Sequence, residues 1–159
     1  MVMNYENKKL IHLVLFQPEI PQNTGSIIRL CSCFSVPIEI IEPCGFILDD
    51  KRLRRVAMDY GNQTQIIRHK SWEYFIESKA RSKRRLVLFT TKTKNNYQDF
   101  TFLNDDLLIF GNESSGVTDN VRENIDEAIT IPISQHARSL NVSMSAAIGL
   151  SEALRQTKK

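Results

Sequence analysis

The chain has 159 residues, of which 42% are hydrophobic and 25% charged, a length and composition typical of one globular domain with a substantial core. Its formal net charge of +3 permits a polyanionic partner without requiring one. No apolar run reaches membrane-spanning length and the N-terminus lacks an apolar signal stretch, so we expect a cytoplasmic protein that does not enter a membrane. Cys31, Cys33 and Cys44 fit neither a disulfide framework nor a zinc site, and we expect them to be reduced core thiols.

The first predicted elements form a βα unit. Residues Leu10–Phe16 are almost continuously apolar, which predicts a strand buried on both faces, with His12 as a core side chain rather than a ligand. The loop that follows contains two prolines. We therefore predict a helix capped by Asn23 or Thr24 that ends near Phe34.

Apolar runs and polar loops continue to alternate along the rest of the chain. Further strands are predicted at residues 38–41, 65–68, 86–91, 106–110 and 129–133. Helices are predicted at residues 51–58, from 72 after a cap at Ser71, from Thr118 or Asp119 to about 125, and through 150 after caps at Ser139 and Asn141, with residues 78–85 as a charged connection. This alternation predicts an α/β fold with a parallel sheet and helices on both faces.

A basic cluster follows the second predicted strand, at Lys51, Arg52, Arg54 and Arg55. Positive charge in the first turn of a helix opposes the helix dipole, so an external phosphate explains the cluster better than helix stability does. A solvated helix face is the alternative interpretation.

Three polar segments stand at predicted strand ends, at residues 23–29, 111–116 and 138–143. Open α/β sheets bind ligands at the carboxyl ends of their strands. In the second segment two glycines bracket Glu113, and in the first Gly25 and Arg29 share a helix face, which leaves space for a ligand unless Arg29 is a surface arginine. The glycine and lysine motifs of common nucleotide-binding loops, the serine hydrolase motif and the zinc protease motif do not occur.

In order and spacing, these segments resemble the three motifs of the SPOUT class of S-adenosylmethionine-dependent RNA 2'-O-methyltransferases. The segments PEIPQNTG (18–25), IIRLC (27–31), IIEPCGF (40–46), DDKRLRR (49–55) and DY (59–60) are similar to those of the small YibK-type tRNA (cytidine/uridine-34) 2'-O-methyltransferases. The resemblance covers residues 10–156.

The resemblance implies one SPOUT domain over residues 1–159, with residues 1–9 as an N-terminal extension and a deep C-terminal trefoil knot at about 85–156. It implies that the knotted loops bind S-adenosylmethionine, without a metal, at Phe89, Gly111, Ile131 and Ser139. It also implies a homodimer in which Arg29 points toward the cofactor site of its partner.

Among the residues that the resemblance assigns to the reaction, Arg29 is the one expected to act most directly. Proposals for the family make this arginine a base, but a guanidinium keeps its proton in proteins, so we expect it to hold phosphate and the developing alkoxide. The others are expected to fix the loops and the substrate ribose: Asn23, Glu113, Ser139 and Asn141. His136 is an alternative base because its ordinary pKa lies near neutrality.

The substrate implied by the resemblance is the wobble nucleotide of tRNA, cytidine or uridine 34, in leucine tRNAs. We expect RNA phosphates to contact Lys51, Arg52, Arg54, Arg55 and Arg138. Residues 111–116 read GNESSG where similar enzymes have GPETRG, which weakens the transfer of substrate identity more than that of reaction type. The alternatives are methylation of another tRNA or rRNA ribose, and a knotted RNA-binding protein without turnover.

Overall fold

The computed structural model describes residues 10–49, 51, 55 and 64–158. Its centre is a six-stranded sheet with the order β3-β2-β1-β5-β4-β6, in which every pair of neighbours is parallel. The strands are β1 (His12–Phe16), β2 (Ile38–Ile41), β3 (Ile66–His69), β4 (Leu86–Phe89), β5 (Leu107–Phe110) and β6 (Glu127–Ile129). The predicted parallel α/β fold is confirmed.

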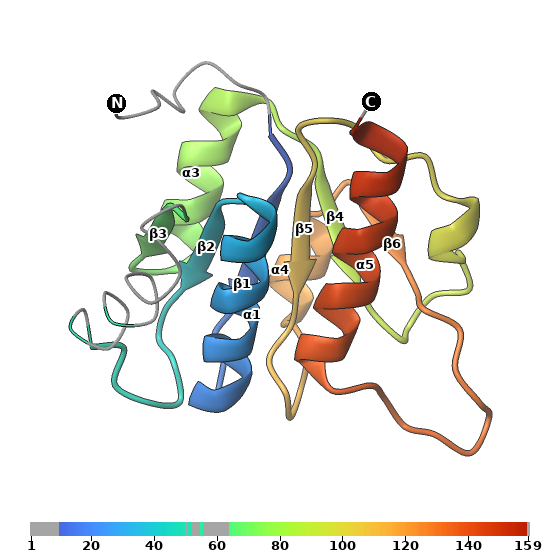
Figure 1. Cartoon of the computed structure of the whole chain (residues 1–159), viewed down its shortest axis with the longest axis horizontal. Coiled ribbons are helices and arrows are strands. Elements are labelled where there is room, and N and C mark those ends of the chain that lie inside the picture. Colours follow the sequence, from blue (N-terminus) through green and yellow to red (C-terminus); the bar gives the residue numbers. More distant parts are fainter. Residues whose placement is uncertain (1–9, 50, 52–54, 56–63, 159) are drawn as a thin grey trace.

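Helices cover both faces of the sheet (Figure 1). The described helices are α1 (Pro21–Phe34), α3 (Trp72–Ser82), the 3-10 turn η2 (Tyr97–Asp99), α4 (Asp119–Glu123) and α5 (Val142–Thr157). Leu13 and Leu15 pack in one core with α1 and α5, while Val14 and Phe16 pack in a second core with α3 and α4. Because side chains alternate along a strand, a strand between two cores must be apolar on both faces.

Helix α1 begins earlier than the sequence predicts. It starts at Pro21, and its N-cap is Ile20, whose side chain makes no capping bond. Proline is accepted at the first helical position because its missing N–H would have no partner in the helix. The prediction that Asn23 or Thr24 caps the helix is therefore wrong, and the Asn23 side chain bonds to Glu113 instead.

Strand β6 also differs from its prediction, since it ends at Ile129, where the predicted strand begins. Its partner β4 ends at Phe89, which pairs with Ile129, so the chain beyond has no further β4 residue to pair with. Thr130 makes an isolated bridge to Asn96. In β3 the observed strand is shifted by one residue, and α3 continues through Ser82 into the predicted charged connection.

The cap of α5 lies on Asn141. Its side-chain oxygen accepts hydrogen bonds from the backbone N–H groups of Ser143, at 2.9 Å, and Met144, at 3.4 Å. This confirms one of the two predicted caps, whereas Ser139 lies in the loop before the helix. Thr118 likewise caps α4 by accepting from the N–H of Val121.

The cysteines differ in exposure. Cys31 is buried and Cys44 half-buried, but Cys33 is exposed, so the expectation of core thiols is wrong for Cys33. Burial raises the pKa of Cys31 well above its usual value. Burial, with a smaller contribution from Glu42, raises the pKa of Cys44 to about 11. Both thiols are therefore protonated near neutral pH, which makes them poor nucleophiles.

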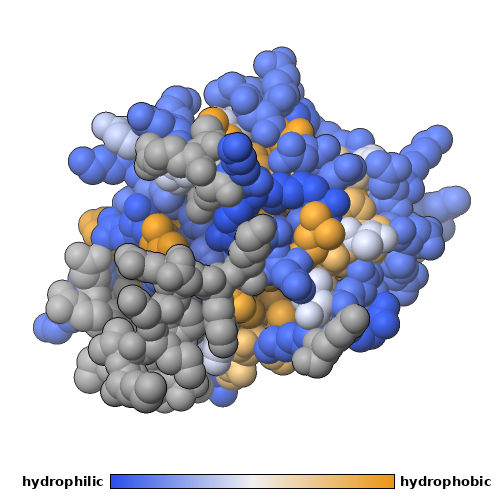
Figure 2. Space-filling model, turned by 90° about the horizontal axis from the view of Figure 1, so that it is seen from above, coloured by the Kyte–Doolittle hydropathy of each residue, from blue (hydrophilic) through white to orange (hydrophobic). Residues whose placement is uncertain are grey.

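None of the described helices is long and apolar enough to cross a membrane. The face of the molecule drawn in Figure 2 is mostly hydrophilic, with small separate hydrophobic areas among polar side chains.

A buried carboxylate sits on β2. Glu39 is 0% exposed, and its two oxygens lie 2.6 Å from His12 Nδ1 and 2.6 Å from His69 Nε2. Arg84 Nη1 lies 3.2 Å from the His12 ring nitrogens. Burial of a carboxylate is tolerated when its oxygens are hydrogen-bonded in this way. His12 is thus a hydrogen-bonded interior side chain, as predicted.

Replacing this carboxylate tests its structural value. Glu39→Ala removes the carboxylate that both His12 and His69 contact and leaves a cavity, so the free energy of unfolding should fall by about 2–4 kcal/mol in urea denaturation. The control is Glu77→Ala, which removes an exposed carboxylate on α3 and should change it by less than about 0.5 kcal/mol. Equal stability of the two variants would show that the histidine cluster contributes little.

Candidate functional site

A cavity of about 680 Å³ lies at the carboxyl edge of the sheet. It is lined from segments 88–92, 110–117, 130–133 and 139–145, together with Ile20, Asn23 and Arg122. Three of these segments directly follow β4, β5 and β6, and parallel strands bring their carboxyl ends to one edge. The three polar segments that the sequence singled out therefore all contribute to one cavity.

The Glu113 carboxylate joins the loop after β5 to the start of α1. One oxygen accepts from the backbone N–H of Glu19 at 2.8 Å. The other accepts from the N–H of Ile20 and from Asn23 Nδ2, each at 3.1 Å. The first turn of α1 has no acidic residue of its own, so Glu113 supplies negative charge to this helix end from another segment.

Asn23 extends this connection to the third segment. Its side-chain oxygen accepts a hydrogen bond from Asn141 Nδ2 at 3.0 Å. The oxygen of Asn141 is occupied by the cap of α5, where it also accepts from the Ser143 hydroxyl. One chain of hydrogen bonds thus joins Glu113, Asn23 and Asn141, so that the start of α1, the loop after β5 and the start of α5 are held together.

The loop at 111–116 is a tight turn that depends on its two glycines. Asn112 and Gly116 exchange two backbone hydrogen bonds, of 2.9 and 3.1 Å. A Cβ on Gly111 would lie 2.5 Å from the carbonyl carbon of Gly116, and Gly116 itself has a φ of +72°. A side chain on Gly111 would clash with the turn, and one on Gly116 would be strained at this left-handed φ, which explains the bracketing glycines in the sequence.

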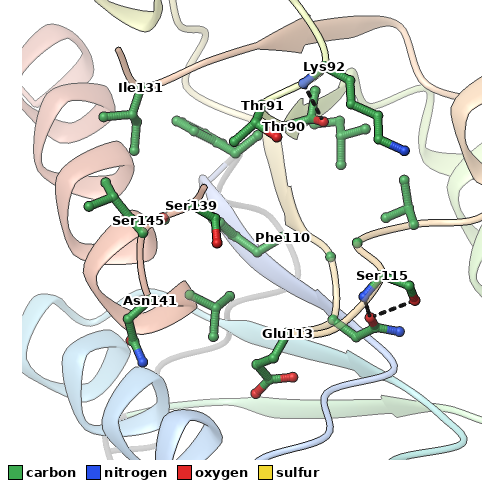
Figure 3. A pocket seen from close by; sticks show the side chains of 18 of the residues that line it. Thr90, Thr91, Lys92, Phe110, Glu113, Ser115, Ile131, Ser139, Asn141 and Ser145 are labelled. Atoms are coloured by element: carbon green, nitrogen blue, oxygen red, sulfur yellow. Dashed lines mark hydrogen bonds between the residues drawn. The ribbon is translucent and has the colours of Figure 1, made fainter. Parts of the chain in front are cut away.

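The rings of Phe89 and Phe110 line the cavity, and Phe102 packs behind Phe89. Phe89 stacks on Phe110 with ring centroids 4.7 Å apart, and Phe102 stacks at 6.4 Å from Phe89. A Cβ on Gly149 of α5 would lie 2.5 Å from Phe89 Cζ, so the absence of a side chain there lets the helix approach the ring. Ile131 lies across the cavity from Ser115 (Figure 3).

Charge is distributed unevenly around the cavity. The acidic Glu113 lies on one side, together with the neutral Asn141, and the basic Lys92 lies on the opposite side (Figure 3). Arg122 also lines the cavity, where its guanidinium is held by Asp119 at 2.6 Å and by the Val117 carbonyl at 2.9 Å. A ligand with separated positive and negative groups would match this arrangement.

The described structure brings most of the predicted site residues to this cavity, which is lined by Asn23, Phe89, Gly111, Glu113, Ile131, Ser139 and Asn141. Arg29, His136 and Arg138 are exposed and are not among its lining residues. Lys51 and Arg55 are also exposed, whereas Arg52 and Arg54 lie outside the described residues.

Sequence reasoning named Phe89 of β4 but missed the three residues that follow this strand. Thr90, Thr91 and Lys92 line the cavity directly after this strand. Their position at the carboxyl end of a predicted parallel strand was the available signal. Glu19 and Ser114 were also missed, because their contact joins residues 95 positions apart.

Comparison with known proteins points to one family. The model described as the SpoU rRNA Methylase family matches residues 10–151. A tRNA (cytidine(34)-2'-O)-methyltransferase from Beijerinckia indica is 47% identical over 144 residues, which cover 91% of this chain and 90% of the relative.

Solved structures give the same result. One that concerns the 2-OH methylation of C/U34 on tRNA has a TM-score of 0.83 and 33% identity, and covers 93% of this chain and 96% of the other. The SpoU methyltransferase AviRb from Streptomyces viridochromogenes, in complex with the cofactor AdoMet, has a TM-score of 0.79 and 25% identity. That match covers 94% of this chain and 58% of the other.

The contact between α5 and Phe89 can be tested with Gly149→Ala. Alanine favours a helix by about 1 kcal/mol, but overpacking against a ring held by its neighbours opposes folding by about 1–3 kcal/mol. We expect a net loss of stability in urea denaturation. Ser151→Ala, at an exposed position of the same helix, should not destabilise the protein. A Gly149→Ala variant more stable than wild type would show that Phe89 moves aside easily.

Proposed function

Because this chain belongs to the SpoU rRNA methylase family, we propose that it methylates the ribose 2'-oxygen of nucleotide 34 of tRNA, with S-adenosylmethionine as the donor. The observation that carries the proposal is the junction of Asn23, Glu113 and Asn141 at one cavity, in a chain so similar to relatives named for this activity. Leucine tRNAs are the proposed substrates within this class.

The cavity fits the proposed donor. S-adenosylmethionine supplies an electrophilic methyl group on a sulfonium when it is bound. The cavity volume of about 680 Å³ lies in the range typical of small-molecule sites, and the lining combines apolar residues with many polar ones. Phe89, Gly111, Ile131 and Ser139 would hold the donor, with Phe89 and Ile131 as apolar surface and Gly111 as exposed backbone. The mixed charge of the lining suits a ligand that is itself partly zwitterionic.

Methyl transfer to a ribose requires an oriented hydroxyl and a route for its proton. Asn23, Glu113 and Asn141 keep the three loops in register through their mutual hydrogen bonds. The Ser139 side chain projects into the cavity, which supports its proposed role in holding the substrate ribose (Figure 3). The Glu113 oxygens already accept three N–H bonds, so its proposed role is to position the loops.

Arg29 is proposed to act in the cavity of a second copy of this chain. It is exposed on α1, and the described structure places it outside its own cavity. Exposed apolar side chains lie on α1 and α5 or just before them, which supports a homodimer through this face: Ile20, Phe34, Leu140 and Met144. Among the described residues, and apart from the neighbours of Gly25 and its own helix backbone, no atom lies within 4 Å of a Cβ built on Gly25, one turn before Arg29, so a ligand group has space beside the guanidinium. Arg29 would there hold phosphate and the developing alkoxide.

A trefoil knot over residues of about 85–156 is also proposed. From the edge strand β6 the chain returns to the middle of the sheet, where α5 packs beside α1 and β5 (Figure 1). The connection between β4 and β5 contacts the far end of α5, where Gln156 bonds to the backbone of Phe100 and Phe102 at 3.0 and 2.9 Å. These contacts support a chain that passes through this connection.

The second candidate function is 2'-O-methylation of another tRNA or rRNA ribose. The observation that favours it is Ser115, which occupies the position of an arginine in similar wobble-position enzymes. Loss of that cation changes the charge offered to RNA beside the cavity. A knotted RNA-binding protein without turnover is disfavoured by the intact hydrogen-bonded set of Asn23, Glu113 and Asn141.

The proposed function predicts a specific product. Incubation of the protein with S-adenosylmethionine and tRNA should give ribose-methylated cytidine or uridine at position 34, detected by nucleoside mass spectrometry and mapping of the modified fragment. Methylation of a base, or of ribosomal RNA alone, would reject the proposed function. Calorimetric titration with S-adenosylmethionine separates the enzyme from the RNA-binding alternative, which predicts no heat of binding.

Arg29→Ala should abolish turnover while folding and dimer size are retained, because the guanidinium serves the transition state and not the core. Single-turnover methylation measures the effect, and light scattering measures the dimer. The matched control is Lys70→Ala, which removes an exposed cation and should retain the wild-type rate. A wild-type rate in Arg29→Ala would remove this residue from the mechanism.

Neutralising the cluster of Lys51, Arg52, Arg54 and Arg55 with glutamine should weaken tRNA binding and reduce its salt dependence. Each lost phosphate contact lowers the slope of log affinity against log salt by about 0.7 to 0.9. Binding assays over a series of salt concentrations measure this slope. An unchanged slope would assign the cluster to solvent, and the double variant Lys70→Gln/Lys83→Gln controls for net charge.

A further inference from the structure

We propose that Glu19 is a positioning residue that locks the loop at 111–116 against the start of α1 through Ser114. This inference rests on the proposed function, because the proposed function assigns both joined segments to the cofactor and ribose site. Glu19 itself is not among the lining residues of the described cavity. Any effect on the reaction must therefore pass through the residues that it holds.

The loop at 111–116 and the segment before α1 are joined by reciprocal hydrogen bonds, in which each provides one carboxylate. Glu19 accepts from the backbone N–H of Ser114 at 2.9 Å and from the Ser114 hydroxyl at 2.8 Å. In return, Glu113 accepts from the backbone N–H groups of Glu19 and Ile20, at 2.8 and 3.1 Å. Each segment thus contributes one carboxylate and receives the other with its own amides. Hydrogen bonds to a charged acceptor contribute more than neutral ones, so the reciprocal pair resists separation of the loops.

The backbone of Glu19 is itself fixed from a third segment. Gly45, in the loop after β2, donates its N–H to the Pro18 carbonyl at 2.9 Å. A Cβ on Gly45 would lie 2.9 Å from the Cα of Glu19, so the two backbone segments are in close contact here. The carboxylate of Glu19 therefore projects from an anchored backbone, as a residue that positions others requires.

The loop that Glu19 holds is closed on itself, since Asn112 and Gly116 are joined by two backbone hydrogen bonds. Ser115 adds two more bonds to the Asn112 side chain, at 2.9 and 3.0 Å. A tether at Ser114 consequently fixes Gly111 and Glu113, which both line the cavity. Without the Glu19 carboxylate the loop keeps its own turn and the bonds of Glu113, but it loses its second attachment to the start of α1. A displacement of about 1 Å can reduce a rate by about 100-fold.

The test compares Glu19→Ala with Glu19→Gln. Alanine removes both acceptors of Ser114, whereas glutamine can accept from the Ser114 N–H and donate to its hydroxyl. In Glu19→Ala we expect amide exchange at residues 113–115 to rise by about 10-fold or more while global stability is largely retained. We also expect affinity for S-adenosylhomocysteine to fall by about 10-fold and kcat on tRNA by about 100-fold.

Glu19→Gln should stay within about 3-fold of wild type in all three measurements, because a positioning role needs the hydrogen bonds and not the charge. Ser114→Ala removes one of the two bonds and should give a smaller effect. In Glu19→Ala/Ser114→Ala the two losses should not add. The control, Glu77→Ala, removes a carboxylate from the opposite face of the sheet.

Two results would overturn the proposal. One is Glu19→Ala with wild-type amide exchange and wild-type affinity for S-adenosylhomocysteine. The other is Glu19→Gln with a loss as large as that of Glu19→Ala, which would assign the effect to charge. Amide exchange does not depend on any reaction. A wild-type protein inactive on tRNA would therefore reject the proposed function, while faster exchange at 113–115 in Glu19→Ala would still support the lock.

Discussion

The Glu113 carboxylate lies against the amino end of α1, where it accepts two backbone N–H bonds and one from Asn23. Helix α1 starts with Pro21, and the side chain of its N-cap residue, Ile20, makes no capping hydrogen bond. The backbone N–H groups at this helix end therefore need acceptors from another segment. Negative charge at this position is favoured by the helix dipole, and the charge comes from a loop more than 90 residues away in the sequence. The same interaction therefore completes a helix and assembles the site.

Parallel strands make this assembly possible. β1 and β5 are neighbours in the middle of the sheet, so the segments that follow them leave its edge side by side. The sheet order reverses direction here, because β2 and β3 extend to one side and β4 and β6 to the other. At this point the Glu113 and Glu19 carboxylates bind the segments after β1 and β5 to each other, and the cavity lies beside them at the carboxyl ends of β4, β5 and β6. The cavity thus follows from the strand order, and its chemistry from the residues that leave the strands.

Much of the cavity is shaped by backbone and by close packing. Gly111 allows the close approach of Gly116, whose left-handed φ favours glycine, and Gly149 brings α5 against Phe89. Phe89 and Phe110 belong to the core as well as to the cavity wall, so the site shares its rigidity with the packed interior. A cavity built this way has few side chains that can relax without disturbing the fold, which is what an oriented transfer reaction requires.

The sequence by itself determined the features that depend on neighbouring residues. Apolar runs identified β2, β4 and β5, a polar cap identified the start of α5 at Asn141, and polar segments at strand ends identified three of the segments that meet at the cavity. Tertiary structure decided the features that depend on a distant partner. The end of β6 was set by the length of β4, the start of α1 by Pro21 and the contacts from Glu113, and the burial of Glu39 by histidines on both adjacent strands. The contact of Glu19 with Ser114 belongs to the same group, because its hydrogen bonds exist only once β1 and β5 lie side by side.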